Sequence, residues 1–384
     1  MLATEVRVLS VITRLGRGGS ERRLYDVLAA VPAAHTVVIG GESDPDVAAA
    51  LAERTEVLRC DALVRDVSPA DDARALGHLV RLLRDRRFDA VHTHQSKAGL
   101  LGRVAARIAG VGVVYHSSSM ASFGPGYGRA ESAAFAIAER VTAPLVTRFF
   151  VVGDDLAGRM RANGVRPDRI EVVRSSLELG PFAPLHDQAD DQADGGRSAA
   201  RRQLGLDPDT PVVAFVGSLD QRKNVLMLPD AVAAATGGGP VTLLMAGAGP
   251  LADQMADDAR QRTDRVDVHL LGHVSDVPLV MRAADVLALP SSAEGLPQVL
   301  VQAARGGLPF VAFDVDGVAE LLALGAVGRS VPLGDHAGFA TALRDELAAD
   351  QGSGGVDPAV WEQWEPSVVA AHYRRSYQLG RELD

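Results

Sequence analysis

Short runs of apolar residues alternate along the chain with longer segments of helical periodicity. The pattern predicts strands at residues 6–12, 35–41, 88–94, 112–117, 148–153 and 170–175, and again at 211–217, 241–247, 266–272, 285–290 and 309–314. Leu24, Val27, Leu28 and Val31 recur at helical spacing between the first two strands. Such alternation is typical of a doubly wound parallel sheet, and here it occurs twice.

One polar segment interrupts the alternation, at residues 186–205, where Asp, Gln and Gly leave little to bury. We therefore predict an N-terminal Rossmann-like domain at residues 1–185, a linker or flexible insertion at 186–205, a C-terminal Rossmann-like domain at 206–355 and a helical tail at 356–384. The tail carries Trp361, Trp364, Tyr373 and Tyr377. Aromatic residues at such density predict that the tail docks on another part of the chain.

Charge and cysteine content narrow the classes of function. The net charge of -10 argues against nucleic acid and anionic membrane as partners, and arginines 81–87 are interpreted as the solvated face of a helix. The opening apolar run is too short for a signal, and no run of about 18 apolar residues predicts a membrane span. The single Cys60 excludes an internal disulfide and favours a reducing compartment, the cytoplasm. The oligomeric state stays open.

In open α/β sheets ligands collect at the carboxyl ends of the strands, so the loops there are the candidates for chemistry. After the first strand, Gly18 and Gly19 leave backbone N–H groups uncovered before a helix, which suits a phosphate, although a tight turn explains them equally well. The loop lacks the GxGxxG spacing of a dinucleotide site, so a nicotinamide dehydrogenase is not predicted.

A second loop follows the strand at residues 88–94. His92, His94, Ser96 and Lys97 crowd the end of that strand. The two histidines lack an evident third metal ligand, so recognition of an acceptor or a phosphate is the functional interpretation and a capped helix start is the alternative.

Three further loops lie in the second half. Arg222 and Lys223, the latter one of only two lysines, could neutralise a diphosphate or lie in a solvated loop, and the 272–276 loop could offer its backbone to a flat base. Glu294 precedes a Gly-Leu-Pro turn and a helix, whose positive end would point at whatever Glu294 holds, and Pro297 suits the first helical turn. The Asp-Val-Asp at residues 314–316 is explained by a turn, and no metal is assigned.

Taken together, these loops resemble those of the retaining family 4 glycosyltransferases. The resemblance runs from "GRGGSE" through "HTHQSKAGLLGRVAARIAG" and "GSLDQRKN" to "ADVLALPSSAEGLPQVLVQAARGGLPFVAFDVDGVAELL". It implies an α/β protein of GT-B fold, in which two Rossmann-like doubly wound domains face a central cleft and a C-terminal helix crosses back to the first domain.

The resemblance also implies roles for individual residues. Donor binding would fall to Gly18, Gly19, Ser218, Arg222, Lys223, Val274, Gly295, Leu296, Pro297 and Gln302, and acceptor binding to His94, Ser96, Lys97 and Ser118. The catalytic candidates are Glu294, Ser119 and His116. No cofactor beyond the nucleotide-sugar substrate is expected.

Three positions depart from the family's pattern. Gln302 stands where a second acid usually bonds the ribose, Ser218 where an arginine is usual, and Ser118 or Ser119 where a histidine lies beside the reacting sugar, with His116 slightly upstream. A charged hydrogen bond is worth roughly 1.5 to 3 kcal/mol and a neutral one roughly 0.5 to 1.5, so Gln302 would weaken ribose binding about tenfold. The missing histidine points to an unusual acceptor, for example a sulfur nucleophile.

We therefore predict a metal-independent, retaining glycosyltransferase that moves a sugar from a UDP- or GDP-sugar to a small acceptor. The alanine- and arginine-rich composition suggests an actinobacterial genome and antibiotic biosynthesis. Two alternatives stay open. In the first, the three departures mark lost chemistry and the chain is a partner or scaffold. In the second, it is a nucleotide-sugar epimerase of GT-B fold.

Overall fold

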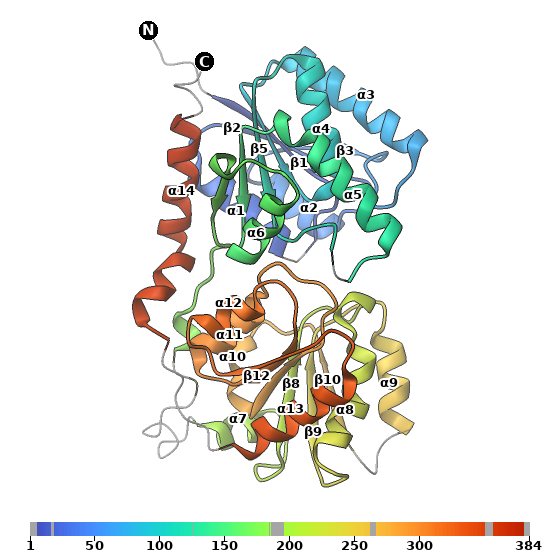
Figure 1. Cartoon of the computed structure of the whole chain (residues 1–384), viewed down its shortest axis with the longest axis vertical. Coiled ribbons are helices and arrows are strands. Elements are labelled where there is room, and N and C mark those ends of the chain that lie inside the picture. The colour runs from blue at the N-terminus through green and yellow to red at the C-terminus, as the bar shows by residue number, and fades with distance from the viewer. Residues whose placement is uncertain are drawn as a thin grey trace. The chain divides into compact units, whose positions relative to one another are not determined.

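The structure is a computed structural model, and it describes residues 6–16, 19–124, 126–183, 185, 196–261, 266–349 and 356–379. The chain forms two compact units (Figure 1). The first unit contains residues 1–177 and 363–384, and the second contains residues 178–362. Each unit is built around its own parallel sheet.

The first sheet has seven strands in the order β3-β2-β1-β4-β5-β6-β7. They are β1 (Arg7–Ile12), β2 (Ala34–Gly40), β3 (Glu56–Cys60), β4 (Ala90–His94), β5 (Val113–Ser118), β6 (Arg148–Val151) and β7 (Ile170–Val172). The helices are α1 (Gly19–Ala30), α2 (Pro45–Ala52), α3 (Pro69–Arg86), α4 (Ser96–Ala109), α5 (Arg129–Thr142), α6 (Asp154–Ala162) and α14 (Pro366–Leu379). The 3-10 helices η1 (Ala143–Leu145) and η2 (Pro167–Arg169) complete the unit.

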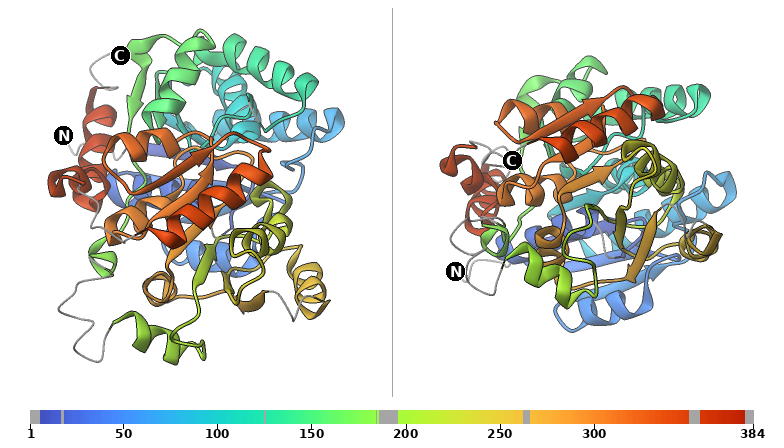
Figure 2. Two further views of the ribbon diagram at one scale, coloured as in Figure 1. Left: turned by 60° about the horizontal axis from the view of Figure 1, so that its bottom comes forward. Right: turned by 90° about the horizontal axis from the view of Figure 1, so that it is seen from below.

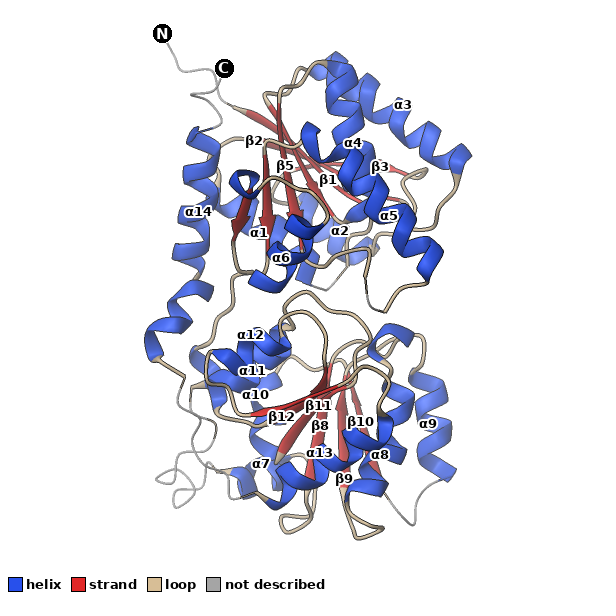
Figure 3. Ribbon diagram, in the orientation of Figure 1, coloured by secondary structure: helices blue, strands red, loops and turns tan. Residues whose placement is uncertain are grey.

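Helices cover both faces of this sheet, which is why its central strand β4 is buried throughout (Figures 2 and 3). On β4, Thr93 points toward α4, where Gly102 leaves room for its methyl group. The neighbouring His92 points to the opposite face and bonds α14 through Tyr377, with 2.7 Å between Nδ1 and the phenol oxygen. Adjacent residues of one strand therefore serve opposite helical layers.

The C-terminal helix α14 belongs to the first unit, as predicted. Besides the bond from Tyr377, the Ser376 hydroxyl donates to Glu171 on β7 at 2.7 Å, and the Tyr115 hydroxyl donates to the Ser376 carbonyl at 3.0 Å. The amide of Leu177, where the chain leaves this unit, donates to the carbonyl of Trp364, where it returns, at 2.9 Å. This hydrogen bond joins the residue where the chain leaves the first unit to the residue where it returns.

The second sheet has six parallel strands in the order β10-β9-β8-β11-β12-β13. They are β8 (Val212–Val216), β9 (Thr242–Ala246), β10 (Asp267–Gly272), β11 (Val286–Leu289), β12 (Phe310–Phe313) and β13 (Gly328–Val331). The helices are α7 (Arg197–Gln203), α8 (Leu228–Ala235), α9 (Ala252–Gln261), α10 (Val277–Ala283), α11 (Gln298–Gly306), α12 (Val318–Ala323) and α13 (His336–Ala348). Short 3-10 helices are η3 (Gly180–Phe182), η4 (Gln221–Lys223), η5 (Val225–Met227) and η6 (Pro358–Trp364).

Both units thus have the predicted doubly wound architecture, but details near the division differ from the sequence analysis. Residues 178–185 fall in the second unit, where the Leu185 amide donates to the Gly306 carbonyl at 3.1 Å. Part of the segment predicted as a linker is helix α7, whose Arg201 is buried and pairs with Asp285 at 2.6 Å. Residues 186–195 of that segment lie outside the described residues. The buried Arg201 fixes α7 in place, and the polar composition of the segment did not indicate this.

Candidate functional site

The topology of the second sheet marks one place where its loops diverge. From β8 the chain builds β9 and β10 on one side, and then returns to add β11, β12 and β13 on the other. The loops that follow β8 and β11 therefore leave neighbouring strands in opposite directions. This switch point is where open α/β sheets bind ligands.

Three charged side chains meet at this switch point. Nζ of Lys223 donates to Oε1 of Glu294 at 2.6 Å, and Nη1 of Arg222 donates to the same oxygen at 3.1 Å. The side chains of Lys223 and Glu294 are only 12% and 11% exposed, whereas that of Arg222 is 33% exposed. The trio joins η4, after β8, to the loop after β11.

Backbone contacts hold the same two loops together. The amide and the hydroxyl of Ser292 both donate to the Arg222 carbonyl, at 2.8 and 3.0 Å. In return, Nη1 of Arg222 donates to the Ala293 carbonyl at 3.0 Å. Arg222 therefore positions the loop that carries Glu294, and it also places a positive charge beside the Glu294 carboxylate.

The charges decide the ionisation state of Glu294. Burial raises the pKa of this carboxyl, but Lys223 and Arg222 lower it by more, so the net pKa lies below the ordinary glutamate value. Glu294 is thus an anion at neutral pH. Two cations around one anion leave a net positive charge, beside the N-terminus of α11, which also favours a negative group.

The turn between Glu294 and α11 has a specific support. Pro297 directly precedes the helix, which begins at Gln298, so the prediction that Pro297 lies in the first helical turn was wrong by one residue. Gly317, at φ 86°, packs against this turn: a Cβ there would lie 2.8 Å from Cα of Leu296 and 2.9 Å from the Gly295 carbonyl. The glycine after the Asp-Val-Asp stretch therefore serves the Glu294 loop.

Other predicted donor residues lie nearby in the sequence without joining the trio. Ser218 is exposed and its hydroxyl donates to Asp220 at 2.7 Å, which shapes the loop after β8. Val274 lies in the loop between β10 and α10. Gln302 is half-buried in α11, and its side chain makes no hydrogen bond within the part of the chain that the structure describes.

In the first sheet the corresponding switch point lies between β1 and β4. Gly19 is the first residue of α1, after β1, whereas Gly18 lies outside the described residues. His94 ends β4 and is 1% exposed, with its ring stacked on His92 at 4.6 Å between centroids. Among the residues that the structure describes, neither ring nitrogen of His94 has a hydrogen-bond partner. Burial, with Arg23 nearby, lowers the pKa of His94 to about 3, so the ring is neutral.

Lys97 does not project freely from the end of β4. Its Nζ lies 2.6 Å from Oδ1 of Asp72 on α3, and it also donates to the Asp66 carbonyl. The side chain is 10% exposed. Lys97 therefore ties α4 to α3, and its charge is balanced there.

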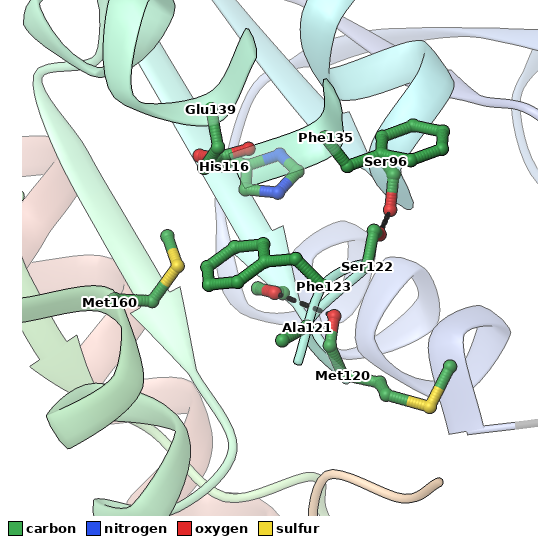
Figure 4. A pocket seen from close by; sticks show the side chains of 10 residues that line it. Ser96, His116, Met120, Ala121, Ser122, Phe123, Phe135, Glu139 and Met160 are labelled. Carbon is green, nitrogen blue, oxygen red and sulfur yellow. Dashed lines mark hydrogen bonds between the residues drawn. The ribbon is translucent and has the colours of Figure 1, made fainter. Parts of the chain in front are cut away.

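A pocket at the carboxyl ends of β4 and β5 brings three predicted residues together (Figure 4). Ser96 begins α4, while His116 and Ser118 lie on one face of β5. The cavity itself is small, about 10 Å³, which is room for about one water molecule. Ser119 is half-buried and follows Ser118, but it is not among the residues that line the pocket.

His116 is held in one orientation at the wall of the pocket. Its Nδ1 lies 2.8 Å from the Thr93 hydroxyl, and Gly99 makes room for the ring, since a Cβ there would lie 2.7 Å from Cε1. Burial, with Arg103 beside it, lowers the pKa of His116 well below the ordinary histidine value. The imidazole is therefore neutral and fixed at working pH.

Sequence reasoning missed most of the wall of this pocket. Met120, Ala121, Ser122, Phe123, Phe135, Glu139 and Met160 also line it, and Glu139 accepts a hydrogen bond at 2.8 Å from Arg103, which is fully buried. In the sequence, the available signal for this wall was Arg103, an arginine among the small residues of α4. The remaining residues come from loops and helices that no strand pattern joins.

Within the described residues, no three His, Cys, Asp or Glu side chains form a group that could hold a metal ion. No helix in the described ranges is long and apolar enough to cross a membrane.

Comparison with known proteins supports the assignment of both units. Residues 18–175 match the family model "Glycosyl transferase 4-like domain", and residues 210–349 match "Glycosyl transferases group 1". The chain is 29% identical over 295 residues to an Escherichia coli UDP-Gal:alpha-D-GlcNAc-diphosphoundecaprenol alpha-1,3-galactosyltransferase, a match that covers 73% of this chain and 72% of that protein. It is 32% identical over 304 residues to a D-inositol 3-phosphate glycosyltransferase of Mycolicibacterium vanbaalenii, covering 74% of this chain and 65% of that one.

Solved structures share the whole fold at low identity. The Anabaena protein HepE, in complex with UDP and glucose, superposes with a TM-score of 0.69 at 19% identity and covers 98% of both chains. Sucrose-phosphate synthase of Thermosynechococcus elongatus gives a TM-score of 0.70 at 18% identity, again over 98% of both chains. The fold and the matched domains together define the class as glycosyltransferases of GT-B fold. Within that class, the first unit is similar to glycosyl transferase 4-like domains and the second to glycosyl transferases group 1 domains.

Proposed function

We propose that the chain is a retaining glycosyltransferase that moves a sugar from a nucleoside diphosphate sugar to a small acceptor. The trio of Arg222, Lys223 and Glu294 at the switch point of the second sheet carries this proposal. Its net positive charge suits a diphosphate, and its buried carboxylate suits the hydroxyls of a sugar. A nucleotide sugar presents both groups in one molecule.

In this proposal Lys223 and Arg222 contact the diphosphate and Glu294 accepts a hydrogen bond from a sugar hydroxyl. The amides of the Gly295–Pro297 turn and the N-terminus of α11 add donors for the sugar and the phosphate. Val274 would present its backbone to the base, and Gln302 would bond the ribose with a neutral group.

The reaction breaks the bond between C1 of the sugar and the diphosphate oxygen. The acceptor nucleophile bonds to C1 on the same face, and its proton passes to the departing diphosphate, so that the products are the glycoside and the nucleoside diphosphate. Lys223 and Arg222 stabilise the charge that develops on the leaving group. The proposal therefore requires no divalent metal. The acceptor would bind at the carboxyl ends of β4 and β5, beside Ser96, His116 and Ser118, with Ser119 adjacent.

UDP is the first nucleotide to test, because the E. coli relative is named for UDP-galactose. GDP is the second. The setting in a reducing compartment and in antibiotic biosynthesis rests on composition alone, and is part of the same proposal.

The test is binding and turnover by the full chain. We expect UDP or GDP to raise the melting temperature, and nucleoside diphosphate to be released from the matching sugar donor when acceptors are supplied. Glu294→Ala should abolish release while the protein stays folded, and Glu53→Ala, at an exposed position, should not. Conversion of the donor without any acceptor would identify an epimerase. Absence of binding to every nucleotide would leave only a scaffold.

A further inference from the structure

The outer face of α5 is apolar and exposed. Ala130, Ala134, Ile137 and Val141 follow one another at intervals of four, three and four residues, so they share one face of the helix. All four are exposed, Ile137 at 64% and Val141 at 69%. No residue of α5 is fully buried. The helix therefore presents an apolar stripe on the side that faces away from the sheet.

The ends of two neighbouring helices extend this stripe. Nη2 of Arg84, on α3, donates to the Ile108 carbonyl on α4 at 3.2 Å. Nη1 of the buried Arg103, also on α4, donates to the Thr142 hydroxyl on α5 at 3.0 Å. The last turns of α3, α4 and α5 consequently lie side by side (Figure 1). Ile108 is 46% exposed there.

Basic side chains accompany the apolar ones. Arg107 precedes Ile108 in the sequence, Arg140 precedes Val141, and both arginines are exposed, as is Arg84. In the last turns of these three helices the exposed acid is Asp85. We call the following residues the helix-end patch: Ile108, Ile137, Val141, Arg84, Arg107 and Arg140.

The charge of this region is opposite to that of the whole chain. Residues 69–142, from α3 to α5, contain ten Lys and Arg against six Asp and Glu, whereas the rest of the chain contains 29 against 43. The net charge of -10 therefore does not describe this face, and the expectation that it excludes an anionic membrane does not apply here. Arginines near a helix C-terminus also balance the helix dipole, but the dipole does not account for the exposed apolar residues between them.

We propose that the helix-end patch docks the protein on the surface of an anionic lipid bilayer. The apolar side chains of Ile108, Ile137 and Val141 enter the boundary between headgroups and acyl chains, and the arginines contact lipid phosphates. A second copy of the chain fits less well, because a two-fold axis would place the patch on itself and bring its like charges together. The inference goes beyond the proposed function, since the donor trio contributes no residue to the patch.

The test is co-sedimentation of the full chain with vesicles. We expect binding to phosphatidylcholine vesicles that contain phosphatidylglycerol, little binding to phosphatidylcholine alone, and weaker binding as the salt concentration rises. Arg107→Gln and Arg140→Gln should each lower the affinity about fivefold, the effect of about 1 kcal/mol per basic residue at the membrane surface. Arg54→Gln, at an exposed position beyond α2, is the matched control and should bind as the unmodified chain does.

The apolar residues provide the second arm. The double variant Ile137→Ser with Val141→Ser should lower the affinity about tenfold. Leu333→Ser removes an apolar side chain that is 39% exposed in the second unit, and it should leave binding unchanged. Circular dichroism checks that each variant is folded.

Three outcomes would overturn the inference. The first is a failure of the full chain to bind vesicles that contain phosphatidylglycerol. The second is binding that the patch variants and the two controls share equally, which would place the contact elsewhere. The third is binding that responds to the arginines but not to Ile137 and Val141, which would exclude docking through the apolar stripe.

Discussion

Nζ of Lys223 and Oε1 of Glu294 lie 2.6 Å apart, and the same carboxylate oxygen also receives Arg222. The cations and the acid that were predicted to hold different parts of a nucleotide sugar therefore contact one another. At the proposed donor site, a diphosphate would compete with Glu294 for its cations. The pair would then tune donor affinity as well as donor position.

Replacement of Glu294 by Gln should separate these two effects. The sugar contact loses its charge, so we expect kcat to fall by about tenfold or more. UDP itself should bind as tightly as before or more tightly, because both cations lose their competitor. Nucleotide release and calorimetry measure the two quantities, with Glu53→Gln as an exposed control. Weaker UDP binding with unchanged kcat would contradict the assignment.

Gly317→Ala should disturb the Glu294 loop from a distance. The new methyl group would meet Cα of Leu296 at 2.8 Å, and the backbone has φ 86°. Gly334 has φ 88° with nothing within 4 Å, so Gly334→Ala imposes the same conformational strain without the collision. Both variants should lose about 1 kcal/mol of stability from strain. Only Gly317→Ala should also weaken donor binding, and equal donor affinities in the two variants would contradict the supporting role of Gly317.

His94 makes stability depend on pH. Its folded pKa is about 3, below the unfolded value near 6.5, so the unfolded chain takes up a proton first as the pH falls. The free energy of unfolding should therefore decrease between about pH 6.5 and pH 3, by up to about 1.4 kcal/mol per pH unit for this one group. Urea denaturation of His94→Leu should show a shallower slope, while His78→Leu, on the exposed side of α3, should keep the slope of the unmodified chain.

Gln302 is the remaining question at the donor site. Gln302→Glu should lower or preserve the donor KM, because a carboxylate makes the stronger bond to a ribose hydroxyl. Gln302→Ala should raise the donor KM by about tenfold or less. Steady-state kinetics with one donor suffice, and the same KM in both variants would remove Gln302 from the site.

The sequence was most informative where burial is complete. All central strands of both sheets were predicted, because strands buried on both faces are continuous apolar runs. The edge strands β3 and β13 were missed, since Glu56, Arg59, Arg329 and Ser330 interrupt the apolar pattern on their exposed sides. The loop residues of the donor trio were predicted from residue type, although their mutual pairing was not. The pocket around His116 was predicted only in part, because its apolar wall is assembled from separate elements by packing.

The hydrogen bond between Leu177 and Trp364 bears on the order in which the chain can fold. Residues 178–362 form a unit continuous in sequence, whereas the first unit needs its last helix from beyond residue 363. During synthesis the second unit can complete its core first, while the earlier-made sheet still lacks the α14 side chains that pair with His92 and Glu171. The first unit, although most of it is synthesised first, is therefore the last to complete its core.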